Sequence, residues 1–111
     1  MLPMIDDPQT PTDFVAAWIT THRNEIGGTQ LKFAWREEHS RAFCAEFETM
    51  KYLIQFCAWD HACCLDIQVL NKVTGGDDYI VAGECNNVEG LLERLNTFLH
   101  WLNINEQNRN A

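Results

Sequence analysis

The sequence predicts an α+β fold, an antiparallel meander sheet of about five strands with an N-terminal and a C-terminal helix packed on one face. Three observations lead to it. Apolar residues recur at helical spacing near both ends of the chain, apolar and polar residues alternate through much of residues 29–84, and short segments join the alternating runs. Short connections favour antiparallel neighbours. The predicted order is α-β-β-β-β-β-α.

The length of the chain, 111 residues, fits one domain that buries a core without disulfides or a metal. Hydrophobic residues make up 46% of the sequence and aromatic residues 11%, which is far from the composition of a disordered chain. We expect residues 1–111 to form a single α+β domain. Residues 1–9 and 104–111 are expected to be flexible tails.

The first helix is predicted to begin at Pro11. Thr10 is a good N-cap, proline is favoured at the first helical position, and the Asp13 carboxylate lies near the positive end of the helix dipole. Gly27-Gly28 stops any continuation, so the helix should end near Asn24. Its apolar stripe consists of Phe14, Val15, Trp18 and Ile19.

Three strands are predicted between residues 29 and 59. In the first, Leu31, Phe33 and Trp35 alternate with Lys32, Ala34 and Arg36, as in a strand with one buried face. A polar turn at residues 37–40 leads to the second strand, residues 43–48, which alternates in the same way. The third, residues 52–59, is largely apolar on both faces and should lie in the middle of the sheet.

Two more strands and the second helix follow. The fourth strand should end near Leu70, residues 71–76 provide a hairpin turn, and residues 79–84 form a less regular fifth strand. Residues 86–89 resemble a capping box. An apolar stripe at helical spacing then predicts a helix from Val88 to about Leu102, after which the pattern is lost.

The overall charge narrows the class of partner. A formal net charge of -8 argues against binding nucleic acid or an anionic membrane surface and favours a basic protein partner. No signal peptide and no apolar run of membrane-spanning length is recognisable, so we expect a cytoplasmic protein. The five cysteines form an odd set, mostly within strand-like runs, which is typical of reduced thiols.

The acidic residues are unevenly distributed. Between Ala42 and Glu93 the chain has nine carboxylates and only two cations, Lys51 and Lys72. Four of the carboxylates lie opposite the apolar set of their own strands and should share one face of the sheet; Asp77 and Asp78 should extend that patch from a hairpin tip. The four are Glu46, Glu48, Asp66 and Glu84. The alternative is ordinary solvated charge with no binding role.

Trp59-Asp60 at the end of the third strand is a second candidate contact. An aromatic side chain beside a carboxylate suits an interface anchor. The alternative, which we prefer because interior aromatics are more common, places Trp59 in the core and makes Asp60-His61 a turn.

No residues point to a metal, a cofactor or catalysis. Cys63-Cys64 are adjacent, whereas zinc ligands are typically spaced as Cys-x2-Cys. Cys57 with His61 lacks a recognisable orienting group, and Gly75-Gly76 lacks the residues of a phosphate loop. We expect the protein not to be an enzyme.

A family resemblance gives a sharper hypothesis. With Trp59-Asp60, the run Leu65-Asp66-Ile67-Gln68-Val69-Leu70, Thr74-Gly75, the segment Tyr79-Ile-Val and a Leu-rich last helix, the chain resembles bacterial toxin-immunity proteins, in particular the TriTu immunity family. The resemblance covers roughly residues 43–102 and implies a protein of contact-dependent growth inhibition or polymorphic toxin systems. Such a protein binds and neutralises a cognate toxin domain, often a basic nuclease, by occlusion, and works as a monomer or weak dimer.

The resemblance carries over no toxin-contact residue, so the predicted contacts come from charge and spacing alone. They are Glu46, Glu48, Trp59, Asp60, Asp66, Asp77, Asp78 and Glu84. The alternative function is an acidic secretion chaperone that holds a segment of an effector protein. A chaperone of that kind would be a stable homodimer with an exposed apolar groove.

Overall fold

The computed structural model describes residues 7–37 and 40–109, with side chains up to residue 106. It confirms the predicted α+β class and the order of elements. The elements are α1 (Pro11–Ile26), β1 (Thr29–Arg36), β2 (Ala42–Glu48), β3 (Tyr52–Trp59), the 3₁₀ turn η1 (His61–Cys63), β4 (Cys64–Asn71), β5 (Asp77–Val81) and α2 (Val88–Arg109).

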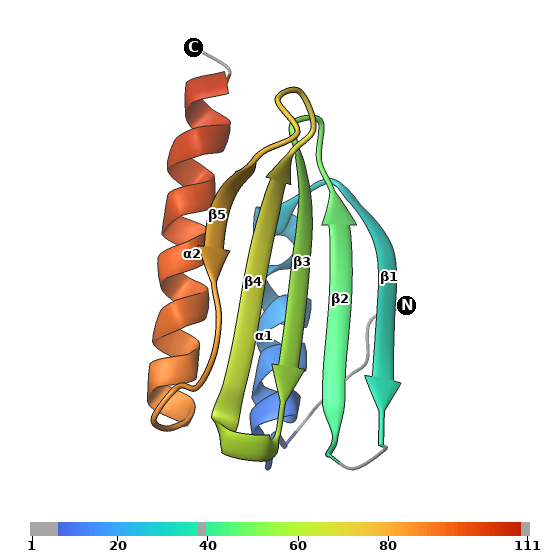
Figure 1. Cartoon of the computed structure of the whole chain (residues 1–111), viewed down its shortest axis with the longest axis vertical. Coiled ribbons are helices and arrows are strands. Elements are labelled where there is room, and N and C mark those ends of the chain that lie inside the picture. Colours follow the sequence, from blue (N-terminus) through green and yellow to red (C-terminus); the bar gives the residue numbers. More distant parts are fainter. Residues whose placement is uncertain (1–6, 38–39, 110–111) are drawn as a thin grey trace.

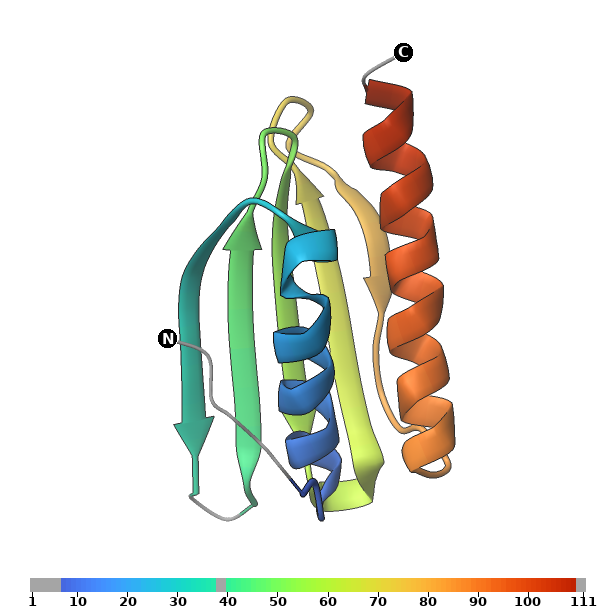
Figure 2. The same ribbon diagram turned by 180° about the vertical axis from the view of Figure 1, so that it is seen from behind.

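The five strands form one antiparallel sheet in the order β1-β2-β3-β4-β5, so each strand pairs with its neighbours in the chain. Figure 1 shows the sheet with α1 behind it, and Figure 2 shows the same molecule from the helix side. The two helices lie side by side on that face and run in the same direction. None of the helices in the described part of the chain lies over the opposite face of the sheet.

Helix α1 begins where the sequence predicts because its first turn is capped twice. The Thr10 hydroxyl accepts a hydrogen bond from the Asp13 backbone N–H, and the Asp13 carboxylate accepts one from the Thr10 N–H. The helix continues past the predicted end at Asn24, because Ile26 is buried in the core and adds a further apolar contact. Gly27, at φ 75°, then ends it, and its N–H bonds the Arg23 carbonyl.

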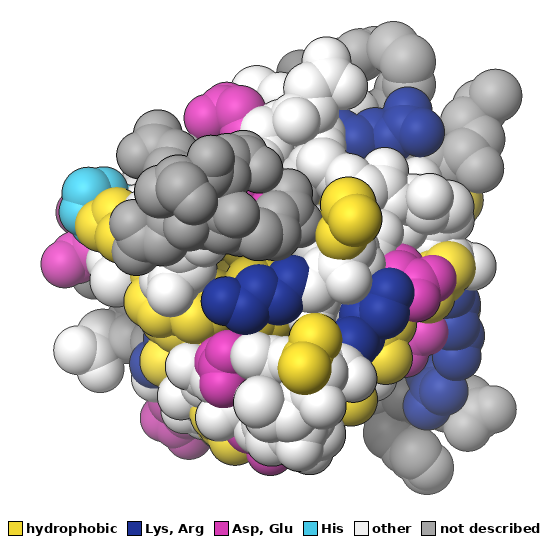
Figure 3. Space-filling view, turned by 90° about the horizontal axis from the view of Figure 1, so that it is seen from above, with side chains coloured by type: hydrophobic (Ala, Val, Ile, Leu, Met, Phe, Trp, Pro, Cys, Tyr) yellow, Lys and Arg dark blue, Asp and Glu magenta, His cyan; other side chains and the backbone are white. Residues whose placement is uncertain are grey.

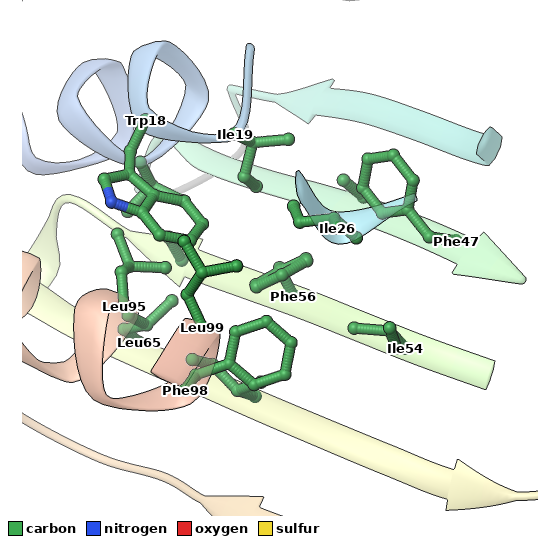
Figure 4. Packing of buried hydrophobic residues seen from close by; sticks show 14 of the residues in the cluster. Trp18, Ile19, Ile26, Phe47, Ile54, Phe56, Leu65, Leu95, Phe98 and Leu99 are labelled. Atoms are coloured by element: carbon green, nitrogen blue, oxygen red, sulfur yellow. The ribbon is translucent and has the colours of Figure 1, made fainter. Parts of the chain in front are cut away.

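The core lies between the helices and the sheet (Figure 4). Its centre is Phe56 on β3, whose ring meets Phe47 of β2 and Phe98 of α2 edge to face, with centroids 6.1 and 5.3 Å apart. Trp18 joins the helices, because its indole N–H donates to the Asn96 side chain at 3.0 Å. The fully buried side chains alternate along β2, β3 and β4, as the period-two patterns of β2 and β4 predict. Strand β3 lies in the middle of the sheet as predicted, but only its residues on the helix side are fully buried, although the sequence is largely apolar on both faces.

One residue of β1 departs from the predicted alternation. The register shifts between Gln30 and Lys32, so Leu31 is the extra residue of a bulge and its side chain is 50% exposed. The prediction that Leu31 shares the buried face of Phe33 and Trp35 is therefore wrong. Those two rings pack against Phe43 as expected.

The predicted end of the last helix is also wrong, since α2 continues from Leu102 to Arg109. Trp101 packs on Tyr52 and Tyr79, with centroids 5.5 and 4.9 Å away, and holds this part of the helix against the sheet. The Thr49 hydroxyl also reaches Glu106, at 3.3 Å. The predicted tail at 104–111 is thus helical as far as Arg109, and residues 1–6 of the predicted N-terminal tail lie outside the described residues.

The fifth strand lies earlier than predicted, at Asp77–Val81 instead of residues 79–84. Asp77 and Asp78 therefore begin a strand and do not form a hairpin tip. Gly83, at φ 96°, takes the chain out of the strand, and Glu84 makes only an isolated bridge to Cys64. Within the part of the chain that the structure describes, no helix is long and apolar enough to cross a bilayer.

Candidate protein-binding face

The sheet face opposite the helices, here called the open face, presents side chains in four rows set by the strand register. Each row crosses the sheet because residues directly opposite in antiparallel strands point to the same side. Read from β1 towards β5, the rows are Thr29, Glu48, Leu53, Leu70 and Asp77; Lys32, Glu46, Gln55, Gln68 and Ile80; Ala34, Cys44, Cys57 and Asp66; and Arg36, Ala42, Trp59, Cys64 and Glu84.

The predicted acidic side chains are largely brought together on this face. Glu46, Glu48, Asp66 and Glu84 all occupy it, as their spacing predicts, and Asp77 joins them. Asp78 does not, because the register shifts at this point of β5 and its carboxylate accepts a hydrogen bond from Asn71, a buried residue of the helix side. The open face thus carries carboxylates from β2, β4 and β5.

Most of these carboxylates already have a partner in the fold. Glu48 pairs with Lys72 at 2.7 Å, and Asp66 accepts from the Gly83 backbone N–H at 3.0 Å. Glu46 and Asp77 accept hydrogen bonds from glutamine amides of the same face, those of Gln55 and Gln68. The glutamine amides are neutral and do not compensate the charge of Glu46 or Asp77. Exposed Glu84 is, like these two, outside the ion pairs of the described residues, so all three carboxylates can attract an external cation.

Two cations on β1 share the open face, which the sequence-based search missed. Lys32 lies directly opposite Glu46, and Arg36 lies at the end of the row that contains Trp59. Both side chains are exposed. Both cations precede the acid-rich stretch in the sequence, so they are not among the acidic and basic residues counted between Ala42 and Glu93. The open face is therefore acidic from β2 to β5 and basic along its β1 edge.

An apolar hollow lies among these charges. It has a volume of about 240 Å³ and is lined by Leu31, Leu53 and Leu70, with Glu46, Gln55 and Gln68 among its polar neighbours. Leu31 reaches it only because of the bulge in β1. Apolar side chains that line an uncovered hollow, with a polar rim, are the arrangement that protein interfaces use.

Trp59 also lies on the open face, so the preferred interpretation of this residue as a core side chain is wrong. It is half-buried and borders a shallow hollow of about 530 Å³ together with Ser40, His61, Cys64, Asp66 and Gly83. Position in β3 explains the placement, because Trp59 alternates with Ala58, which faces the core. The indole is thus available as an interface anchor.

Asp60, its neighbour, has a structural contact. Its Oδ1 accepts hydrogen bonds from the Thr12 backbone N–H at 2.9 Å and the Thr12 hydroxyl at 2.8 Å. The carboxylate thereby satisfies a free N–H in the first turn of α1 and ties η1 to the helix. Because its carboxylate is engaged by Thr12 of α1, Asp60 does not belong to the acidic residues of the open face.

The thiols near His61 lack the surroundings of an activated nucleophile. Burial raises the pKa of the Cys64 thiol, and the nearby carboxylates Glu84 and Asp66 raise it further. Activation requires the opposite shift. Among the described residues, no group of three or more His, Cys, Asp or Glu side chains is arranged to hold a metal ion.

The hairpin end of the sheet differs from the open face. The turns there expose Met50 and Val73, which are 83% and 84% exposed, next to Lys51 and Lys72. Figure 3 views this end and shows hydrophobic, basic and acidic side chains interspersed. The hairpin end is therefore mixed in charge.

Comparison with known protein families finds no match to the chain, and comparison with curated proteins finds none either.

Proposed function

We propose that the protein is an immunity protein that binds a cognate bacterial toxin domain in the cytoplasm and neutralises it by covering the toxin's active surface. The observation that carries the proposal is the open face, a helix-free sheet surface with carboxylates arranged around an apolar hollow. A toxin that acts on nucleic acid presents cations that contact phosphates. The carboxylates of this face are complementary to such a surface.

Charge and apolar contacts have separate roles in the proposed complex. Glu46 and Asp77, whose hydrogen-bond partners are neutral, steer a basic toxin towards the face and raise its association rate. Leu53 and Leu70 in the hollow, with Trp59 beyond it, are the anchors that slow dissociation. Lys32 and Arg36 confine the favourable charge to β2–β5 and so orient the partner.

The proposal predicts that a toxic domain is encoded immediately upstream of the gene for this protein, and the direct test is to co-express the two. Cells should survive induction of the toxin, and the two proteins should purify as one complex. If the cells die because they make more toxin than immunity protein, an inactive variant of the toxin still allows the complex to be isolated. The proposal is overturned if both proteins are present in the extract but the cells do not survive and no complex forms.

A secretion chaperone is the second candidate, favoured by one observation. Leu31 and Ile80 expose apolar side chains on the open face, 50% and 58% respectively, as an effector-holding groove requires. The measured mass in solution separates the two functions. A stable homodimer at micromolar concentration supports the chaperone, whereas a monomer or weakly associating protein supports the immunity function.

A further inference from the structure

Two cysteines face each other at the centre of the open face. Cys44 of β2 lies directly opposite Cys57 of β3, and the Cys57 thiol donates a hydrogen bond to the Cys44 sulfur, with 2.9 Å between the Sγ atoms. Both are free and half-buried. Cross-strand packing alone does not require two adjacent sulfurs here, since any small apolar pair fills the same space.

The backbone positions suit a disulfide without movement of the strands. Directly opposite residues of antiparallel strands have Cα atoms roughly 4.5–5.5 Å apart. Disulfides join Cα atoms roughly 4.4–6.8 Å apart. Only the sulfurs have to approach, from 2.9 Å to about 2.05 Å.

The charges around the pair make its two thiols unequal. The pKa of Cys44 is lowered to about 7, first by the hydrogen bond from Cys57 and then by Arg36 and Lys32 of the neighbouring strand, which together outweigh burial and Glu46. The pKa of Cys57 is raised, first by that same hydrogen bond, then by burial and by the negative charges of Cys44 and Asp66. Cys44 is therefore the more acidic thiol of the pair, and Cys57 holds its proton more tightly.

We propose that Cys44 and Cys57 are a redox modification site, in which Cys44 attacks a small disulfide of the glutathione class and Cys57 resolves the product into a Cys44–Cys57 disulfide. The site goes beyond toxin binding and does not depend on it. A thiol whose pKa lies near the ambient pH is the most effective attacker, since it is both ionised and nucleophilic.

The chemistry balances in two exchanges. The Cys44 thiolate attacks one sulfur of oxidised glutathione, the glutathione S–S bond breaks, and one glutathione leaves as a thiolate. In this mixed disulfide the Cys44 sulfur is no longer a thiolate that accepts the Cys57 hydrogen bond, so that hydrogen bond and the negative charge of Cys44 no longer raise the pKa of Cys57, whereas burial and Asp66 still do. Cys57 then gives its proton to solvent and attacks the Cys44 sulfur, and the second glutathione leaves as a thiolate. Two protein thiols are oxidised and one glutathione disulfide is reduced.

The surroundings admit such a reagent. Ala34, directly opposite Cys44 on β1, is small, and a hollow of about 110 Å³ adjoins Cys57. Exposed Lys32 and Arg36 flank the approach. Because glutathione carries carboxylates, these cations favour its approach to Cys44 over the thiols beside Asp66 and Glu84.

The test equilibrates the reduced full-length protein with mixtures of reduced and oxidised glutathione at pH 7, then quenches in acid and alkylates free thiols. Trypsin cuts after Lys51, which places Cys44 and Cys57 on different peptides, so their disulfide appears as a linked pair. Because Cys63 and Cys64 share the peptide of Cys57, a C63S/C64S variant should give the same linked pair. A disulfide that joins Cys63, Cys64 or Cys85 instead overturns the proposal.

Single variants separate the two roles. Cys57→Ser should accumulate a stable glutathione adduct on Cys44, whereas Cys44→Ser should leave Cys57 no more reactive than Cys63. In wild type the rate of Cys44 alkylation should rise with pH around a midpoint near 7, which is set by the Cys57 hydrogen bond, burial, Arg36, Lys32 and Glu46. Arg36→Gln should move that midpoint upward. Equal alkylation rates for Cys44, Cys63 and Cys64 in the folded wild type contradict the proposal.

Discussion

Asp60 illustrates how one side chain holds two elements together. Its Oδ1 accepts both the backbone N–H and the hydroxyl of Thr12, so it acts on the first turn of α1 from outside that helix. From the sequence, Asp60 is either a binding carboxylate beside Trp59 or, in the preferred interpretation, part of a turn with His61, and the structure has this turn. The contact to Thr12 spans 48 positions in the chain, and no local pattern reveals it.

Replacing this carboxylate should destabilise the fold through the helix terminus. We expect Asp60→Ala to lower the free energy of unfolding by about 1–2 kcal/mol, because an N–H of the first turn loses its acceptor. Asp60→Asn keeps an oxygen at the same place and should cost less than about 0.5 kcal/mol. Urea unfolding measures both, and equal losses would show that charge, and not the cap, is responsible.

Asp13 is the residue through which acid should weaken the fold. Burial raises the pKa of its carboxyl, but Arg41 at 2.6 Å and the backbone N–H groups of Gln9 and Thr10 outweigh this, so the pKa lies below its ordinary value of 3.8. The ionised carboxylate therefore stabilises the fold fully above that ordinary value. Its contribution is lost as the pH falls through the lowered pKa.

Asp13→Asn should accordingly be less stable than wild type at pH 7, and the difference should shrink below about pH 4. Urea unfolding at several pH values gives the comparison. A difference that is constant from neutral to acid pH contradicts the assigned ion pair.

At the scale of elements, the junction of α1 and β1 depends on a close backbone approach. Gly28 has φ 68°, and a Cβ at this position would collide with the Glu48 carbonyl oxygen. The strand can pair with β2 at Thr29 only if this residue has no side chain.

Gly28→Ala should therefore be costlier than a matched glycine change elsewhere. Gly75, in the β4–β5 turn, has φ 78° and no atom within 4 Å of an added Cβ. Gly75→Ala should cost about 1–2 kcal/mol from the backbone conformation alone, and Gly28→Ala more than that. Urea unfolding of the two variants decides the matter; equal costs would mean that β1 yields to the added methyl.

Helices and strands could be predicted from the sequence where residues close together in the chain determine them. Alternation along β2–β4 and the caps of α1 are local, so the meander and the helix start follow from the sequence. The end of α2 is not local, because Trp101 and Glu106 are held by Tyr52 and Thr49 of the sheet. The bulge at Leu31 has no signature in the sequence.

For the whole molecule, the arrangement of the helices decides which surface is free. Both helices cover one face of the sheet, so the side chains of the open face, among them Glu46, Gln55 and Trp59, are not covered by a helix. Period-two spacing predicted the shared face of the carboxylates. It could not predict the hollow, which needs Leu31, Leu53 and Leu70 from three strands, or the basic edge from β1.

The most direct test of the proposed binding face is the affinity of two double variants for the toxin domain proposed as the partner, purified in an inactivated form. Glu46→Lys with Asp77→Lys reverses charge on the open face, and Glu25→Lys with Glu93→Lys makes the same change in net charge on the exposed sides of the helices. Calorimetric titration at low and moderate salt should give a Kd at least about tenfold weaker, with a flatter salt dependence, for the first variant only. If both double variants bind the toxin domain equally weakly, or if both bind it as tightly as wild type, the open face is not the toxin-binding surface.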